Sequence, residues 1–301
     1  MSDLPDFDKL WDYNDPAKTE KAFQELLPVA ERAGDRAYHA QLLTQIARTH
    51  SLRRQFDDAH GILDDAETLI VNIDNPSNDP TQTTRVRLLL ERGRTFNSAG
   101  DTDSARPLFK EAWELARKAG EDYHAVDAAH MLGICEPADA SLMWNNRAME
   151  AAEASDDPRA VEWLGPLYNN TGWTYHDEGE YEKALELFEK GLAWRSERDN
   201  PQATRIAKWT VGRAKRSLGR TEEALAMQQS LLEEHEAAGT PAGTSDGYVF
   251  EEVAECLYAL GRPDEARPHF GRAYQELSKD DWLVDNESER MGRLKRLGSE
   301  Q

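Results

Sequence analysis

The sequence has few cysteines and no long apolar run. Two of its 301 residues are cysteine, Cys135 and Cys256, which is too few for a disulfide framework, so both thiols are expected to be reduced. Hydrophobic residues make up 39% of the chain, but they never form a run long enough to cross a bilayer. The opening stretch MSDLPDFDKLWDY is acidic where a secretory signal needs a basic flank and an apolar core. These features predict a soluble, cytoplasmic protein.

Basic residues are also scarce. The chain has 36 Lys and Arg against 57 Asp and Glu, which gives a formal net charge of -21. Nucleic acids and anionic membranes attract proteins through clustered Lys and Arg. The charge balance therefore predicts that neither is a partner, although a local basic groove is compatible with it.

Several motifs of known chemistry are missing from the chain. There is no HExxH, CxxC, Walker loop or dinucleotide glycine fingerprint. His124 and His130 are six residues apart, do not share a helix face, and make a poor metal site with Cys135. We therefore expect no metal and no cofactor.

One cluster invites an enzymatic interpretation, namely His176, Asp177 and Glu178, with Glu251 as a further acid. General acid–base catalysis there would need a cleft and carboxylates with perturbed pKa values, neither of which the sequence indicates. We expect Asp177 and Glu178 to be solvated residues at a helix end. The sequence thus favours a protein without enzymatic activity.

Apolar residues recur at helical spacing along almost the whole chain, without the sustained alternation of a half-buried strand. Helix starts are marked where Asp15, Asp79, Asp157 and Asn200 each precede a proline. Helix ends are marked by glycines suited to a left-handed conformation, at Gly34, Gly100, Gly120, Gly179, Gly219, Gly239 and Gly261. The sequence predicts an all-α protein of antiparallel helical hairpins.

Four segments of the chain align without gaps. Each has a small residue in its first helix, a turn glycine seven residues later and an alanine five residues beyond that. The small residues are Gly93, Gly172, Gly212 and Ala254, and a Phe follows the alanine by four residues at Phe109, Phe188 and Phe270. Small residues allow close helix approach, and we expect the large ones to fill the gap to the next hairpin.

This pattern resembles the tetratricopeptide repeat, whose small, aromatic, glycine, alanine and Phe positions are matched by Gly172, Tyr175, Gly179, Ala184 and Phe188. The marker alanines recur at an average of about 41 residues, longer than the standard repeat of about 34. The chain is in this respect similar to the long-repeat bacterial members of the family. The resemblance implies a right-handed α-solenoid, a superhelix of antiparallel hairpins.

The resemblance also implies how the chain is organised. We expect one solenoid domain over residues 1–301, with an N-terminal cap at 1–15, six to seven hairpins over about 16–279 and a C-terminal capping helix at 280–301. Asn286 with Glu289 is predicted to start that helix, while Trp282 and Leu283 cover the last hairpin. The N-terminal aromatic residues either cap the first helix or mediate dimerisation, so a homo-oligomer is compatible with the sequence.

In this family the resemblance places function on the concave face lined by the first helices. The residues expected to point into the groove share one helix face. They are Arg48, Arg94, Asn97, Asn169, Asn170, Trp173, His176, Trp209, Arg213, Arg216, Glu251 and Tyr258.

Two interpretations of this groove stay open. Arginine forks and asparagine amides could hold a peptide that bears acidic groups, with Trp173 and Trp209 as anchors. Alternatively, the arginines pair with neighbouring glutamates such as Glu91, and the tryptophans pack between repeats.

Three functions follow from these interpretations. The first is a non-enzymatic scaffold or adaptor for a protein or peptide partner, which the repeats and the missing motifs favour. The second is a peptide- or partner-sensing regulator that changes its superhelical shape on binding. The third is an enzyme with a site near His176.

Overall fold

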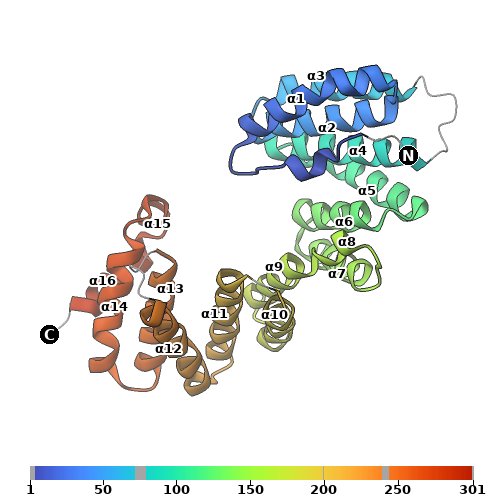
Figure 1. Ribbon diagram of the computed structural model, residues 1–301. Coiled ribbons are helices and arrows are strands. Elements are labelled where there is room, and N and C mark those ends of the chain that lie inside the picture. Colours follow the sequence, from blue (N-terminus) through green and yellow to red (C-terminus); the bar gives the residue numbers. More distant parts are fainter. Residues whose placement is uncertain (1–3, 72–78, 199, 239–243, 300–301) are drawn as a thin grey trace. The chain divides into compact units, whose positions relative to one another are not determined.

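A computed structural model of the protein describes residues 4–71, 79–198, 200–238 and 244–299 (Figure 1). Every regular element within these ranges is a helix, and none of these helices is long and apolar enough to cross a membrane. In chain order they are η1 (Phe7–Leu10), α1 (Pro16–Ala33), α2 (Arg36–Leu52), α3 (Phe56–Val71), α4 (Asp79–Ala99), α5 (Thr102–Ala119), α6 (Asp122–Cys135), α7 (Ala138–Glu153), α8 (Pro158–Val161), α9 (Leu164–Asp177), α10 (Tyr181–Ser196), α11 (Pro201–Ser217), α12 (Thr221–Ala238), α13 (Thr244–Ala259), α14 (Pro263–Leu277), α15 (Asp281–Asn286) and α16 (Ser288–Ser299).

The helices form two compact units, residues 1–167 and residues 168–301. Unit 1 contains the hairpins α2–α3, α4–α5 and α6–α7, and its first helices α2, α4 and α6 contact one another in that order. Unit 2 contains α11–α12 and α13–α14, with α16 packed on α14. The predicted all-α array of antiparallel hairpins is therefore confirmed, while its extension as a single domain stays a prediction.

Three of the four predicted helix starts are capped by side chains, whereas Asp79 is itself the first residue of α4. The carboxylate of Asp15 accepts a hydrogen bond from the amide of Lys18 at 3.0 Å, and Asn200 accepts one from Ala203 at 3.0 Å. Asp157 caps α8, a helix of four residues. Each cap satisfies one of the amides that a helix N-terminus leaves without a partner.

Most hairpin turns end the first helix with a left-handed glycine. Six of the seven predicted glycines have a positive φ, and Gly239 lies outside the described residues. Arg54, with φ 61°, takes the same position between α2 and α3. Its amide bonds to the carbonyl of residue 51 and the next amide to that of residue 50, as in the Gly100 turn. The turn without a glycine therefore keeps the geometry of the others.

The spacing of 16 residues between Gly172 and Phe188 places them in contact. A Cβ at Gly172 would lie 2.5 Å from Cε1 of Phe188, and one at Gly93 would lie 2.6 Å from Cε1 of Phe109. Phe188 thus fills its own hairpin, and it also belongs to a buried cluster with Val211 of the next one. The large residues therefore pack both within a hairpin and between hairpins.

The predicted start of the C-terminal capping helix is wrong. Asp280 caps a helix there first, because its carboxylate accepts a hydrogen bond from the amide of Trp282 at 3.0 Å. Asn286 consequently ends α15, and its side-chain amide donates to the carbonyl of Trp282 at 2.9 Å. The segment forms two helices, α15 and α16, instead of one.

The two residues expected to cover the last hairpin, Trp282 and Leu283, differ in how far they are buried. Trp282 is 61% exposed and covers little, whereas Leu283 is buried with Met291 and Leu294 of α16. A Cβ at Gly298 would lie 2.6 Å from the backbone nitrogen of Gly271, so α16 approaches α14 very closely. Helix α16 therefore supplies the cover that was expected of Trp282.

Candidate functional site

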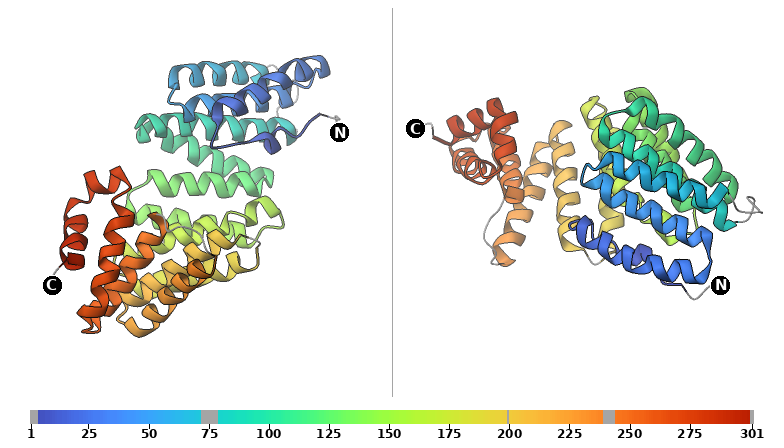
Figure 2. Two further views of the ribbon diagram at one scale, coloured as in Figure 1. Left: turned by 60° about the vertical axis from the view of Figure 1, so that its left-hand side comes forward. Right: turned by 90° about the horizontal axis from the view of Figure 1, so that it is seen from above.

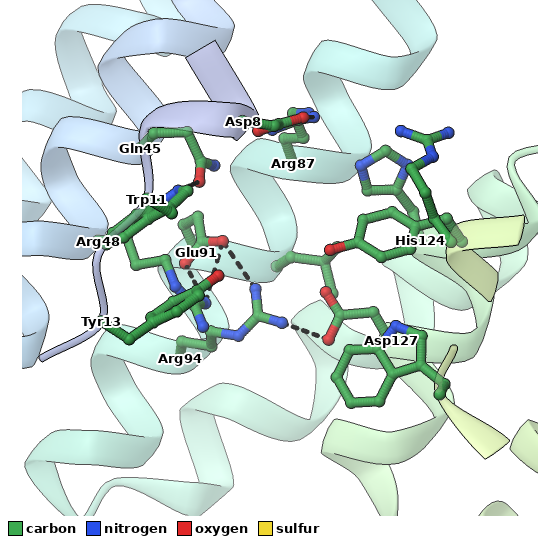
Figure 3. Close-up of a pocket in the computed structure, with 14 residues that line it drawn as sticks. Asp8, Trp11, Tyr13, Gln45, Arg48, Arg87, Glu91, Arg94, His124 and Asp127 are labelled. Carbon is green, nitrogen blue, oxygen red and sulfur yellow. Dashed lines mark hydrogen bonds and ion pairs between the residues drawn. The ribbon is translucent and has the colours of Figure 1, made fainter. Parts of the chain in front are cut away.

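Unit 1 carries a hollow of about 400 Å³ on the face formed by its first helices (Figure 3). Helices α2, α4 and α6 contribute most of the lining, and the N-terminal segment and the α8 region contribute the rest. We call this site the unit 1 hollow; its lining residues are Asp8, Trp11, Tyr13, Gln45, Arg48, Arg87, Leu90, Glu91, Arg94, Tyr123, His124, Asp127, Arg159 and Trp163. Its volume lies within the range of sites that take a small molecule or a few side chains.

A chain of alternating charges crosses the floor of the hollow. Arg48 Nη1 lies 3.1 Å from Glu91 Oε2, and Arg94 Nη1 lies 2.7 Å from Glu91 Oε1. Arg94 also pairs with Asp127. This ion ladder, Arg48–Glu91–Arg94–Asp127, links α2, α4 and α6, and both of its carboxylates are buried.

Burial and pairing together fix the charges of the ladder. Burial alone would raise the pKa of Asp127, but attraction and a hydrogen bond from Arg94 hold that pKa below its usual range. Burial likewise works against the charge of Arg94, yet Asp127 and Glu91 raise its pKa overall. Both groups are therefore charged at neutral pH.

Tyr123 contributes a neutral polar group to the same wall. Burial, followed by the negative charge of Asp127, raises the pKa of Tyr123 to about 12. Its phenol therefore keeps its proton at neutral pH and can donate a hydrogen bond.

The predicted site residues of unit 1 have partners within the chain. Arg48 and Arg94 line the hollow, but their pairing with Glu91 favours the alternative in which the arginines bind neighbouring glutamates. Asn97 is not among the lining residues, and its side-chain oxygen accepts a hydrogen bond from the thiol of Cys135 at 3.2 Å.

Several lining residues were missed by sequence reasoning. Arg87 had a signal, since it lies seven residues before Arg94 and therefore shares its helix face. Asp127 had none, because its partner Arg94 comes from another helix. Arg159 had none, because its partner Asp157 is local and gives no indication of the hollow. Trp11 and Tyr13 were expected only as cap or dimer residues.

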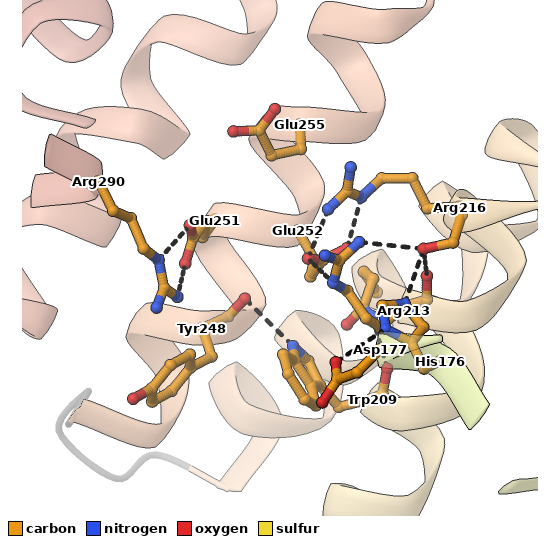
Figure 4. A network of polar contacts seen from close by, with 12 residues as sticks. His176, Asp177, Trp209, Arg213, Arg216, Tyr248, Glu251, Glu252, Glu255 and Arg290 are labelled. Carbon is orange, nitrogen blue, oxygen red and sulfur yellow. Dashed lines mark hydrogen bonds and ion pairs between the residues drawn. The ribbon is translucent and has the colours of Figure 1, made fainter. Parts of the chain in front are cut away.

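Unit 2 repeats the pairing of arginines across neighbouring hairpins (Figure 4). Arg216 Nε lies 2.7 Å from Glu252 Oε2, and Arg213 Nε lies 3.3 Å from Glu252 Oε1. Glu251 is paired in turn with Arg290 of α16, whose Nε lies 2.8 Å away. The predicted groove arginines of unit 2 thus bind α13 carboxylates.

The predicted aromatic anchors pack on one another. The ring of Trp209 lies 5.9 Å from that of Trp173 and 5.9 Å from that of Tyr248, and its indole N–H donates to the Tyr248 carbonyl. These contacts favour the alternative in which the tryptophans pack between repeats. Among the remaining predicted residues, Asn169 donates to the side chain of Asn170, and Tyr258 is 47% exposed.

His176 lies next to both Ser217 and Asp177, a set of residue types that nucleophilic enzymes use. Its Nε2 is 2.9 Å from the hydroxyl oxygen of Ser217, but its Nδ1 is 3.7 Å from Asp177, too far for an orienting hydrogen bond. The Ser217 hydroxyl also contacts the carbonyl of Arg213 at 3.3 Å. Burial, then the charge of Arg213, lowers the pKa of His176. The geometry does not assemble a relay of the kind that activates a serine.

Within the part of the chain that the structure describes, no group of three or more His, Cys, Asp and Glu side chains is arranged to hold a metal ion.

Comparison with known proteins agrees with this architecture. Residues 165–198 and 254–272 each match a family model of the tetratricopeptide repeat. Among solved structures, the apo form of RapI superimposes with a TM-score of 0.68 at 12% identity, covering 96% of this chain and 85% of RapI. No curated protein matches the chain by sequence.

Two further structures share the fold. A signal transduction ATPase with a tetratricopeptide repeat sensor, from Pyrococcus horikoshii, gives a TM-score of 0.71 at 13% identity over 93% of this chain and 41% of that protein. The apo quorum sensor NprR from B. thuringiensis gives 0.54 at 13% identity, over 97% and 79% of the two chains. The two matched segments therefore carry tetratricopeptide repeats, and these likenesses show that the chain shares the fold of tetratricopeptide-repeat proteins.

Proposed function

We propose that this protein is a non-enzymatic interaction protein that binds a peptide segment of a partner in the unit 1 hollow. The observation that carries the proposal is the lining of the hollow, where four arginines, three carboxylates and four Trp or Tyr rings surround about 400 Å³. Binding sites combine aromatic anchors with a few fixed polar groups in this way.

The volume and the chemistry of the hollow suit a peptide. A space of about 400 Å³ takes a few side chains rather than a folded surface. Charges of both signs lie at fixed positions along the ion ladder, and a peptide offers backbone donors and acceptors to match them. Four arginines line the hollow, and arginine forks recognise carboxylates, so a partner segment with acidic groups fits best.

A regulatory form of this function is favoured by the ion ladder. A ligand carboxylate that competes for Arg48 or Arg94 would weaken the contact of Arg48 with Glu91 or that of Arg94 with Asp127. The first contact links α2 to α4 and the second links α4 to α6, so binding would alter the packing of successive hairpins. Two of the proteins with the same fold are described as sensors, which supports this form of the proposal.

The proposal can be tested with a random-peptide library displayed on phage and selected on the immobilised full chain. Arg159→Glu is the test variant, because Arg159 lines the hollow and its side chain is 56% exposed, so charge reversal should leave the fold intact. Arg92→Glu is the matched control, because Arg92 pairs with Asp64 and Glu67 of α3 and is not among the lining residues.

We expect a convergent peptide whose affinity falls at least about tenfold in Arg159→Glu, equivalent to about 1.4 kcal/mol, and stays unchanged in Arg92→Glu. Circular dichroism should show all three proteins equally folded. If no sequence converges, or if both variants lose binding equally, the hollow is not the binding site.

A further inference from the structure

The N-terminal segment lies along the first-helix face of unit 1 and forms one wall of the hollow (Figures 2 and 3). We call residues 5–13 the strap. Their sequence, PDFDKLWDY, combines acidic and aromatic residues.

An acidic side chain of the strap binds a buried arginine. Arg87 Nη1 donates to Asp8 Oδ1 at 3.0 Å, and its Nη2 pairs with the second carboxylate oxygen. Arg87 is only 7% exposed, so this two-pronged contact is held in a largely desolvated place. Such forks are how arginine recognises carboxylates with defined geometry.

The aromatic side chains of the strap bind the same face. The indole N–H of Trp11 donates to the side-chain oxygen of Gln45 at 3.0 Å. The Trp11 and Tyr13 rings stack at 4.7 Å, and the Arg48 guanidinium lies 5.8 and 5.6 Å from their centroids. Phe7 is buried in a cluster with Phe23 and Leu42.

Side chains, more than backbone, hold the strap in place. The strap backbone makes hydrogen bonds with two helix side chains: the hydroxyl of Tyr38 donates to the Pro5 carbonyl, and the hydroxyl of Thr19 bonds to the backbone of Asp12. The outer side chains of the strap face solvent, since Tyr13 is 59% and Leu10 41% exposed. A bound peptide is held by pockets and forks in the same way.

We infer that the strap occupies the first-helix face as an intramolecular ligand, and that the partner segment has the same chemistry: an aromatic residue, a carboxylate directly after it, and a second aromatic residue three positions beyond. The inference rests on the proposed function and specifies its ligand. Strap and partner compete for Arg87, Gln45 and Arg48.

Charge complementarity supports this occupant. Without Asp8, Arg159 keeps its partner Asp157, and the three remaining arginines of the hollow share the carboxylates of Glu91 and Asp127. A carboxylate from the partner therefore restores the balance that the strap provides, whereas a basic segment would add to the excess positive charge.

The test uses the full chain and a fluorescently labelled peptide that copies residues 5–14. In the variant Asp8→Lys/Trp11→Ala the strap loses its fork and its indole contact, and the face becomes accessible. Fluorescence anisotropy should show the peptide binding this variant at least about tenfold more tightly than wild type, where the strap competes at high local concentration.

A charge swap separates recognition from a general effect on folding. Adding Arg87→Glu to a strap weakened by Asp8→Ala/Trp11→Ala, which cannot pair with the new glutamate, should abolish binding of the native peptide. A peptide with lysine in place of the aspartate that corresponds to Asp8 should restore it. If the double variant fails to fold, Trp11→Ala alone serves as the weakened protein. We expect it to bind the peptide more tightly than wild type does, by a smaller factor than the double variant.

Three results would overturn the inference: equal affinity for wild type and the folded variant, no binding to the folded variant, or no rescue by the lysine peptide. A wild-type dimer that dissociates in Asp8→Lys would also overturn it, because the face would then be occupied by the strap of a second copy.

Library peptides that need Arg159 but do not compete with the strap peptide would contradict this inference and leave the proposed function standing. A strap peptide that binds while the library yields no sequence dependent on the hollow would contradict the proposed function instead.

Discussion

At the scale of single residues, Gly172 shows why the repeat needs a small side chain. A Cβ there would lie 2.5 Å from the Phe188 ring, and Phe188 is fully enclosed, so the ring cannot turn away freely. We expect Gly172→Ala to lower the free energy of unfolding by about 1–3 kcal/mol, the usual cost of overpacking a core.

Gly61 provides the matched control for that prediction. It lies inside α3, and nothing stands within 4 Å of an added Cβ. Gly61→Ala should raise the free energy of unfolding by about 0.5–1 kcal/mol, because alanine loses less backbone entropy in a helix. Urea denaturation followed by circular dichroism measures both changes, and equal effects would show that the Gly172 contact with Phe188 is unimportant.

The ion ladder makes a prediction about pH. Arg94 holds the pKa of Asp127 below its usual range, so the folded state favours the charged carboxylate. This stabilisation is complete above the unfolded-state pKa of about 3.9 and is lost as the pH falls through the lower folded-state pKa.

The variant Asp127→Asn lacks that titration. At neutral pH the free energy of unfolding of wild type should be larger than that of Asp127→Asn. The difference between the two proteins should shrink as the pH falls below about 4. Denaturation curves of both proteins across this range give the comparison. A difference that is constant or grows with acidity would contradict the assignment of the charges in the ladder.

At the scale of elements, the turn between α2 and α3 is built like its neighbours but without glycine. Arg54 adopts a φ of 61°, a left-handed conformation that costs a residue with a Cβ roughly 1–2 kcal/mol. Arg54→Gly should therefore raise the free energy of unfolding by about 1 kcal/mol.

The reverse change tests the same turn geometry. Gly100 has a φ of 91° and the same pattern of amide bonds, so Gly100→Arg should be destabilising by about 1 kcal/mol or more. Thermal unfolding of the two variants beside wild type settles the sign. A loss of stability in Arg54→Gly would mean that the cation–π contact of Arg54 with Phe56 outweighs the backbone strain.

The sequence predicted those elements whose signals are local. Glycines mark helix ends, and a capping residue followed by proline marks helix starts. The spacing between Gly172 and Phe188 indicates which helices pair. The break between α15 and α16 was missed because two residues, Asp280 and Asn286, both suit a helix start, and packing of α16 on α14 decides between them. The site was predicted only in part, because the partners of Arg94 and Arg87, Asp127 and Asp8, are distant in sequence.

At the scale of the whole molecule, the account assigns binding to one place on one unit. In unit 2, Arg213 and Arg216 are paired with Glu252, and Trp173 and Trp209 pack on each other between hairpins. The residues of unit 2 that were expected to bind a ligand therefore stabilise the packing of its hairpins. Unit 2 also has a hollow, of about 390 Å³, beside Trp209 and Tyr248, but Arg205 is the one arginine among its lining residues, whereas four arginines line the unit 1 hollow.

The measurement that tests this claim most directly is amide hydrogen exchange on the full chain, with and without a peptide selected from the library. We expect slower exchange on binding in the parts of α2, α4 and α6 that line the hollow and faster exchange in the strap, which the peptide displaces, with α3, α5 and unit 2 unchanged. Protection confined to α3 and α5, or to unit 2, would contradict it.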